Sequence, residues 1–260
     1  MDWTDEGIVL SARKHGESSA IAQLLTKHRG RHAGLVRGGA GRKIRGVLQP
    51  GNQVTASWRA RLAEHLGTLT VEPVRARAAN LLSDWDRLAG LSAACAVAEV
   101  ALPEREPHPG TYEGMLTLLD ELERSDSWPL IYVRWEAGLL AELGFGLDLR
   151  SCARTGVETG LAYLSPRSGR AVSEAAAGEY RDRLLPLPAF LVANGRGAGH
   201  AVPATPEDLR DAITDGLALT GHFLERHVLG NRGGALPPAR TRLVERFSRR
   251  TTISSDISVQ

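Results

Sequence analysis

Short apolar runs separated by glycine-containing turns fill the first 75 residues. Val54, Ala56 and Trp58 alternate with polar residues, which is the two-residue period of a strand with one buried face. Between these runs, no stretch with a helical apolar period is long enough to form a helix that connects parallel strands. The pattern therefore predicts a small closed β-barrel, either an oligonucleotide-binding (OB) barrel or a similar SH3-like barrel. The five predicted strands are residues 7–14, 19–27, 31–37, 52–59 and 66–74.

After Arg77 the apolar period changes to three and four residues, which indicates amphipathic helices. Thr205-Pro206 supplies an N-cap and a proline at the first helical position. The predicted helices are residues 81–102, a second containing Tyr112 to Leu122, 128–143, 206–230 and 238–250. We thus expect a barrel domain (1–78), a helical domain (79–250) with an irregular insert at about 147–200, and a disordered tail (251–260).

Charge separates the two predicted domains. Arg13 to Arg61 holds eleven Lys and Arg against one acid, Glu17, so this segment has a net charge of +10 within a chain of net charge +2. Residues 81–260 have a net charge of −5. A basic segment with glycines beside its cations indicates contact with nucleic acid. The acidic helical half is then expected to contact proteins. The predicted contacts are Arg13, Lys14, Lys27, Arg29, Arg31, Arg37, Gly38, Gly39, Arg42, Lys43, Arg45, Arg59 and Arg61, with His28 and His32 beside them.

The sequence gives little support for a nucleotide-binding loop, a catalytic site, a metal site or a disulfide framework. The segment Gly38–Lys43 lacks the Walker spacing, and no paired acid and base or metal cluster occurs in the second half. Cys95 and Cys152 are too few for a disulfide framework. The N-terminus lacks a signal pattern and no apolar run approaches 18 residues, so we expect a cytoplasmic, nucleoid-associated protein that is not an enzyme and has no membrane partner.

Two aromatic features each allow two interpretations. Trp58 is either barrel core, which we favour, or a platform that stacks on a base. The stripe Trp128, Tyr132 and Trp135 is either helix core or the lining of an apolar groove for a partner peptide. In that groove the residues would be Arg124, Trp128, Tyr132 and Arg134.

Several segments together resemble the RecO family of bacterial recombination mediators, over nearly the whole chain. The matching segments are Glu6–Leu10, Gly16–Ser19, Leu25-Thr26 with Gly30-Arg31, Val36–Ala40, Val47–Pro50 and Leu139–Phe145 followed by Leu149 and Cys152. The resemblance implies an N-terminal OB barrel on an all-α C-terminal domain with a zinc-ribbon-like insert. It also implies binding of single- and double-stranded DNA, strand annealing, and recognition of the acidic tail of single-strand binding protein. With RecR, the family helps RecA to load onto coated DNA.

The chain departs from the family where the insert would hold zinc. Cys152 is present, but Thr155, Val172 and Ala175 stand where further cysteines would be needed. A lone thiol cannot build a closed four-ligand site, so we predict no metal and no cofactor. Leu161, Tyr163, Leu164 and Val172 should hold the insert by packing instead. The alternative function is an RNA-binding OB protein of translation or RNA processing, because the same basic barrel would fit RNA.

Overall fold

The computed structural model describes residues 1–192, 205–230 and 234–256. The chain divides into two compact units, one of Met1–Trp128 with Pro237–Arg240 and one of Pro129–Leu236 with Thr241–Gln260. Each unit is described by itself below.

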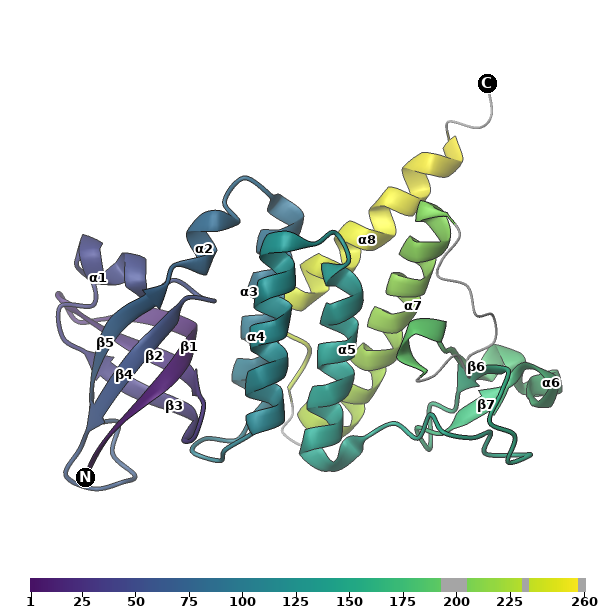
Figure 1. Cartoon of the computed structure of the whole chain (residues 1–260), viewed down its shortest axis with the longest axis horizontal. Helices are drawn as coiled ribbons and strands as arrows, with labels where there is room; N and C mark the ends of the chain where they lie inside the picture. The colour runs from purple at the N-terminus through teal and green to yellow at the C-terminus, as the bar shows by residue number, and fades with distance from the viewer. Residues whose placement is uncertain (193–204, 231–233, 257–260) are drawn as a thin grey trace. The chain divides into compact units, whose positions relative to one another are not determined.

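Five strands form a closed barrel at the start of the first unit (Figure 1). They are β1 (Asp2–His15), β2 (Ser19–Thr26), β3 (Gly30–Val36), β4 (Gln53–Arg59) and β5 (Thr68–Arg75), in the order β1-β2-β3-β5-β4. All neighbours are antiparallel except β3 and β5, which pair in parallel at Leu35 and Thr68. The prediction of five strands is confirmed. The first begins at Asp2 rather than Gly7, because its acidic start pairs with β4.

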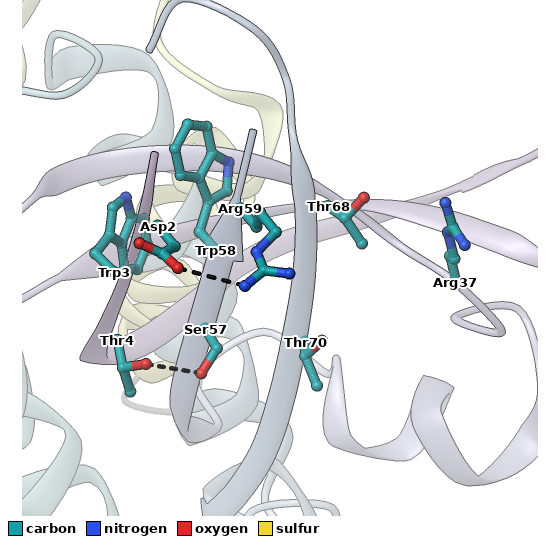
Figure 2. A pocket seen from close by; sticks show the side chains of 9 residues that line it. All are labelled: Asp2, Trp3, Thr4, Arg37, Ser57, Trp58, Arg59, Thr68 and Thr70. Carbon is teal, nitrogen blue, oxygen red and sulfur yellow. Dashed lines mark hydrogen bonds and ion pairs between the residues drawn. The ribbon is translucent and has the colours of Figure 1, made fainter. Parts of the chain in front are cut away.

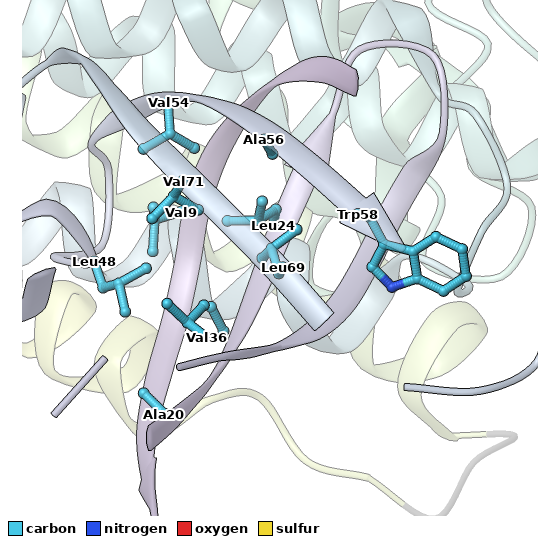
Figure 3. Close-up of a cluster of buried hydrophobic side chains, with 11 residues drawn as sticks. Val9, Ala20, Leu24, Val36, Leu48, Val54, Ala56, Trp58, Leu69 and Val71 are labelled. Carbon is cyan, nitrogen blue, oxygen red and sulfur yellow. The ribbon is translucent and has the colours of Figure 1, made fainter. Parts of the chain in front are cut away.

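The barrel core is built from the inward-facing residues of every strand (Figure 3). Trp58 is 3% exposed and its Nε1 donates a hydrogen bond to the Leu66 carbonyl at 2.9 Å. Its ring stacks on Trp3 with centroids 5.8 Å apart. Of the two interpretations of Trp58, barrel core is therefore correct, and the ring is not free to stack on a base.

A short helix, α1 (Arg42–Val47), follows β3 in the segment 38–51, where the sequence predicted neither a strand nor a helix. That prediction was wrong because the segment is glycine-rich and has too few apolar positions to show a helical period. The helix is anchored by the cap residue Leu48, which is 2% exposed and donates its backbone N–H to Ile44. Before the helix, Gly39 lies so close to Ala20 that an added Cβ would approach the Ala20 Cβ to 2.8 Å.

Helices α2 (Arg77–Asn80), α3 (Trp85–Ala101) and α4 (Pro109–Arg124) complete the first unit. Asp84 caps α3 by accepting hydrogen bonds from the next turn, and Cys95 on the buried face contacts the Val9 carbonyl of β1 at 3.7 Å. Arg77 is 3% exposed and donates to Gln53 of β4 at 3.0 Å and to Asp120 of α4 at 2.6 Å. These contacts tie the barrel to its helices.

In the second unit, α5 (Trp128–Leu140) continues into a π-helix (Ala141–Phe145), and α7 (Pro206–Phe223) continues into another (Leu224–Leu229). Thr205 forms the predicted cap with Asp208. The last helix, α8, spans Pro238–Asp256 and so includes six positions of the segment for which the sequence predicted disorder. Among the described residues, no helix has the length and apolar character needed to cross a membrane.

The insert between α5 and α7 was predicted to be irregular, and this is wrong in part. It contains a three-stranded antiparallel sheet in the order β7-β6-β8, with α6 (Glu174–Ala177) beside it (Figure 1). The strands β6 (Leu161–Leu164), β7 (Ala171–Ser173) and β8 (Leu185–Pro186) are too short to show a period in the sequence. The predicted packing residues Leu161, Tyr163, Leu164 and Val172 are all buried. Residues 193–200 of the predicted insert lie outside the described residues.

Candidate nucleic-acid interface

Three of the predicted cations are already paired with acids. Lys27 Nζ lies 3.9 Å from Glu113, and Arg59 lies 3.4 Å from Asp2. The Arg31 side chain is only 14% exposed, since it donates to the Leu102 carbonyl at 2.9 Å and lies 3.3 Å from Glu104. Arg31 therefore holds the segment after α3 against the barrel. Because all three side chains are paired with acids, they add less to the positive electrostatic field of the barrel than three unpaired cations would.

The other eight predicted cations are exposed, and none makes an ion pair within the part of the chain that the structure describes. They are Arg13, Lys14, Arg29, Arg37, Arg42, Lys43, Arg45 and Arg61. Because no described acid pairs with them, they form the part of the barrel surface best suited to contact phosphates.

Five of the eight gather on two neighbouring segments. Arg13 and Lys14 end β1, and Arg42, Lys43 and Arg45 lie on α1. A backbone hydrogen bond of 3.0 Å from Ala40 to Ser18 ties the turn before α1 to the turn after β1. The structure thus brings together cations that are about 30 positions apart in the sequence.

A recess of about 390 Å³ lies between these segments. We name it the β1–α1 recess, and its lining residues are Ala12, Arg13, Lys14, Glu17, Ala20, Gly39, Ala40, Arg45, Leu48, Gln49 and Pro50. Of these residues, Arg13, Lys14, Gly39 and Arg45 were predicted to contact nucleic acid, whereas Gln49 and the apolar lining were not. Gln49 lies in the segment Val47–Pro50 that carries part of the resemblance, but nothing in that match indicates a contact with nucleic acid.

A second recess, of about 650 Å³, lies against strands β1, β4 and β5 (Figure 2). Thr4, Ser57 and Thr70 pair across the three strands as a row of hydroxyls, with the Thr4 and Ser57 oxygens 2.9 Å apart. The adjacent row contains Glu6 and Glu72. Asp2 neutralises Arg59 here, whereas Arg37, which also lines this recess, makes no ion pair within the described residues. This recess therefore has one unpaired cation, against Arg13, Lys14 and Arg45 in the β1–α1 recess.

The two histidines predicted beside the phosphate contacts do not join them. His32 is 5% exposed and its ring centroid lies 4.9 Å from those of both Trp3 and Trp58. His28 Nδ1 lies 2.9 Å from the carboxylate of Asp5. His32 is therefore part of the barrel core, and His28 closes the turn between β2 and β3.

The predicted peptide groove is not assembled as expected. Trp128 and Tyr132 are 5% and 1% exposed, as the core interpretation requires, whereas Arg124 is exposed at the end of α4. Arg134 donates two hydrogen bonds to the Phe190 carbonyl, at 3.1 and 2.9 Å. An apolar recess of about 490 Å³ beside Arg134 is lined by Ala137, Ala141, Leu147, Leu149, Phe190, Leu191 and Val192.

Cys152 lies in the insert and is 1% exposed. Its sulfur accepts a hydrogen bond from the Ser173 backbone at 3.3 Å. Burial opposes ionisation, but hydrogen bonds from Thr155 and Ser173 lower the pKa of the thiol to about 6. The described residues contain no group of three His, Cys, Asp or Glu able to hold a metal, and the other three zinc ligands of a closed site have no counterparts here.

Comparison with known proteins gives one consistent result. Residues 1–77 match the family model described as "Recombination protein O N terminal", and residues 82–234 match "Recombination protein O C terminal". The chain is similar to proteins named "DNA repair protein RecO". That of Rhodospirillum centenum is 56% identical over 256 residues, covering 98% of both chains. Those of Cereibacter sphaeroides and Rhodospirillum rubrum are 53% and 52% identical, covering 96% of this chain and 100% and 97% of theirs.

Proposed function

Because the chain belongs to the RecO family, we propose that it is a DNA repair and homologous recombination mediator whose barrel binds single- and double-stranded DNA. The observation that carries this proposal is the set of eight exposed cations without ion pairs on the barrel, defined above. Contacts from these side chains to phosphates carry no base information, so binding should be weakly sequence-specific.

The proposed activity needs no catalytic group. Two complementary strands repel each other, and a cationic surface that screens both of them raises the rate at which they meet and anneal. Loading of RecA onto DNA coated by single-strand binding protein, with RecR as partner, would use the acidic helical part. Residues 81–260 have a net charge of −5, which suits protein contacts better than DNA contacts. This role places the protein at the nucleoid, in the cytoplasm.

We also propose that residues 1–78 form an OB domain and that the insert of the helical domain is zinc-ribbon-like and has lost its metal-binding cysteines except Cys152. The closed barrel with α1 between β3 and β4 supports the first assignment. The small sheet β7-β6-β8, with Cys152 held by Ser173, supports the second. About one equivalent of zinc per chain after purification in metal-free buffer would contradict it.

The DNA-binding proposal is tested by fluorescence anisotropy with a labelled single strand and the Arg42→Ala/Lys43→Ala/Arg45→Ala variant. We expect the affinity to fall about tenfold or more, because three phosphate contacts are lost. The matched control removes three exposed cations of the second unit, Arg150, Arg167 and Arg183. Equal losses in both triple variants would contradict the assignment of DNA binding to the barrel. Binding of the acidic tail peptide of single-strand binding protein should survive the first variant.

RNA binding is the alternative, since phosphate contacts do not distinguish the two sugars. Competition between DNA and RNA single strands of one sequence decides between the two functions. We expect the DNA strand to compete at least as well as the RNA strand. A clear preference for RNA would require contacts to the 2′-hydroxyl and would favour the alternative.

A further inference from the structure

We propose that the β1–α1 recess seats one unpaired nucleotide, and that this recess gives the barrel a preference for single over double strands. The inference rests on the nucleic-acid binding proposed above and adds to it a site, a ligand and a source of selectivity. It divides the unpaired cations into those that line the recess and those that do not.

The lining of the recess combines two kinds of surface. Its floor is apolar, with Ala20 and Leu48 at 4% and 2% exposure beside Ala12 and Pro50. The charged residues that line the recess are Arg13, Lys14 and Arg45 and one acid, Glu17, so the charge of the lining is positive overall. A phosphate alone gains nothing from an apolar floor, whereas the faces of a base and a sugar do. The combination therefore fits a whole nucleotide, with the base on the floor and the phosphate beside the cations.

The recess is held in shape by backbone contacts. Gly51 N–H donates to the Val9 carbonyl at 2.8 Å, and Asn52 Nδ2 donates to the carbonyls of Gly46 and Val47 at 3.0 and 3.2 Å. These bonds fix the end of α1 against β1. A preformed recess loses little conformational freedom when a ligand enters, which favours binding.

A duplex cannot use this floor without losing its own stacking. Its bases are paired and stacked, and extruding one costs a few kcal/mol. Arg42 and Lys43 lie on α1 but do not line the recess, so they can reach the phosphates of either kind of strand. Arg45 lines the recess, and its charge should therefore count more for a single strand than for a duplex.

The proposal is tested by filling the recess without changing its charge. Ala12 is exposed on β1 and lines the recess, so Ala12→Leu occupies its floor. Thr70→Leu makes a comparable change at an exposed strand position of the other recess. Anisotropy is measured at fixed salt with a labelled oligothymidylate and with a labelled hairpin duplex. Circular dichroism verifies that each variant is folded.

We expect Ala12→Leu to weaken single-strand binding about fivefold to tenfold, the scale of a partly lost base contact, and to leave duplex binding unchanged. Thr70→Leu should change neither. In a second pair, Arg42→Ala should weaken both ligands equally, and Arg45→Ala should weaken the single strand more. The proposal is overturned if Ala12→Leu affects both ligands alike or neither, or if the two arginine variants behave identically. If the wild type binds neither ligand, the proposed function fails as well.

Discussion

His32 places a titratable group inside an aromatic cluster. Its ring packs in a T-shaped arrangement against the rings of both Trp3 and Trp58, and neither ring nitrogen has a hydrogen-bond partner among the described residues. Burial, and then the positive charge of Arg105, lower the pKa of the imidazole from 6.5 to about 4. The folded barrel therefore favours the neutral ring, and protonation of His32 opposes folding.

The barrel should lose stability as the pH falls from about 6.5 towards 4. In this range the unfolded chain binds a proton at His32 that the folded chain does not, so the full contribution, about 3 kcal/mol, is present only above 6.5. Urea midpoints at pH 7, 5.5 and 4.5 measure it. His32→Phe should flatten this dependence, and His15→Phe, at an exposed position of β1, should not. An unchanged pH dependence in His32→Phe would refute the assignment.

Single residues show where sequence reasoning succeeds and where it fails. The alternation of Val54, Ala56 and Trp58 favoured the core interpretation of Trp58, and its burial confirms that interpretation. His32 and Arg31 were predicted to contact phosphate because they lie in a basic run. Their actual partners, the two indole rings and the segment after α3, come from positions distant in the sequence. Charge counts cannot show which cations are neutralised by such tertiary contacts.

At the scale of the elements, the turn between β2 and β3 is locked against the segment that joins α3 to α4. Gly30 has φ +68°, and an added Cβ would lie 1.9 Å from the Glu106 carbonyl oxygen. Gly16 has a similar φ of +64°, but nothing lies within 4 Å of an added Cβ. The two glycines share a left-handed backbone and differ only in the space around them.

Gly30→Ala should therefore destabilise the chain by about 3 kcal/mol or more, because left-handed strain and a backbone clash add together. Gly16→Ala should cost only about 1 kcal/mol, the strain alone. Thermal unfolding of the two variants beside the wild type measures the difference. Similar melting temperatures for both variants would show that the connecting segment moves away without cost, against the packing described here.

The long elements were predictable and the short ones were not. The helices α3, α4, α5 and α7 repeat apolar residues over several turns, and the barrel strands end at glycine turns. By contrast, α1 has six residues and β6, β7 and β8 have four or fewer. These short elements form because adjacent residues are buried by contacts with distant parts of the chain, as Leu48 is at the end of α1. The β1–α1 recess depends on α1, so its shape could not be predicted either.

At the scale of the whole molecule, opposite charges occupy the two ends of the chain. The basic segment 13–61 lies within the first unit, and the acidic excess lies after residue 80. DNA should therefore contact the barrel through a limited set of cations. The structure adds to the sequence a count of unpaired cations, because eight of the eleven predicted contacts make no ion pair within the described residues.

That number limits how strongly salt should weaken binding. Each phosphate neutralised in a single strand contributes about −0.7 to the slope of log K against log salt concentration, so eight contacts allow a slope of at most about −5 to −6. The Arg42, Lys43 and Arg45 triple variant should reduce this slope by about 2. The Arg150, Arg167 and Arg183 triple variant should leave it unchanged. Anisotropy titrations at four salt concentrations measure all three slopes.

A flat wild-type slope would rule out the electrostatic mechanism of binding. A slope steeper than −6 would mean that the three paired cations or the helical part also contact the strand.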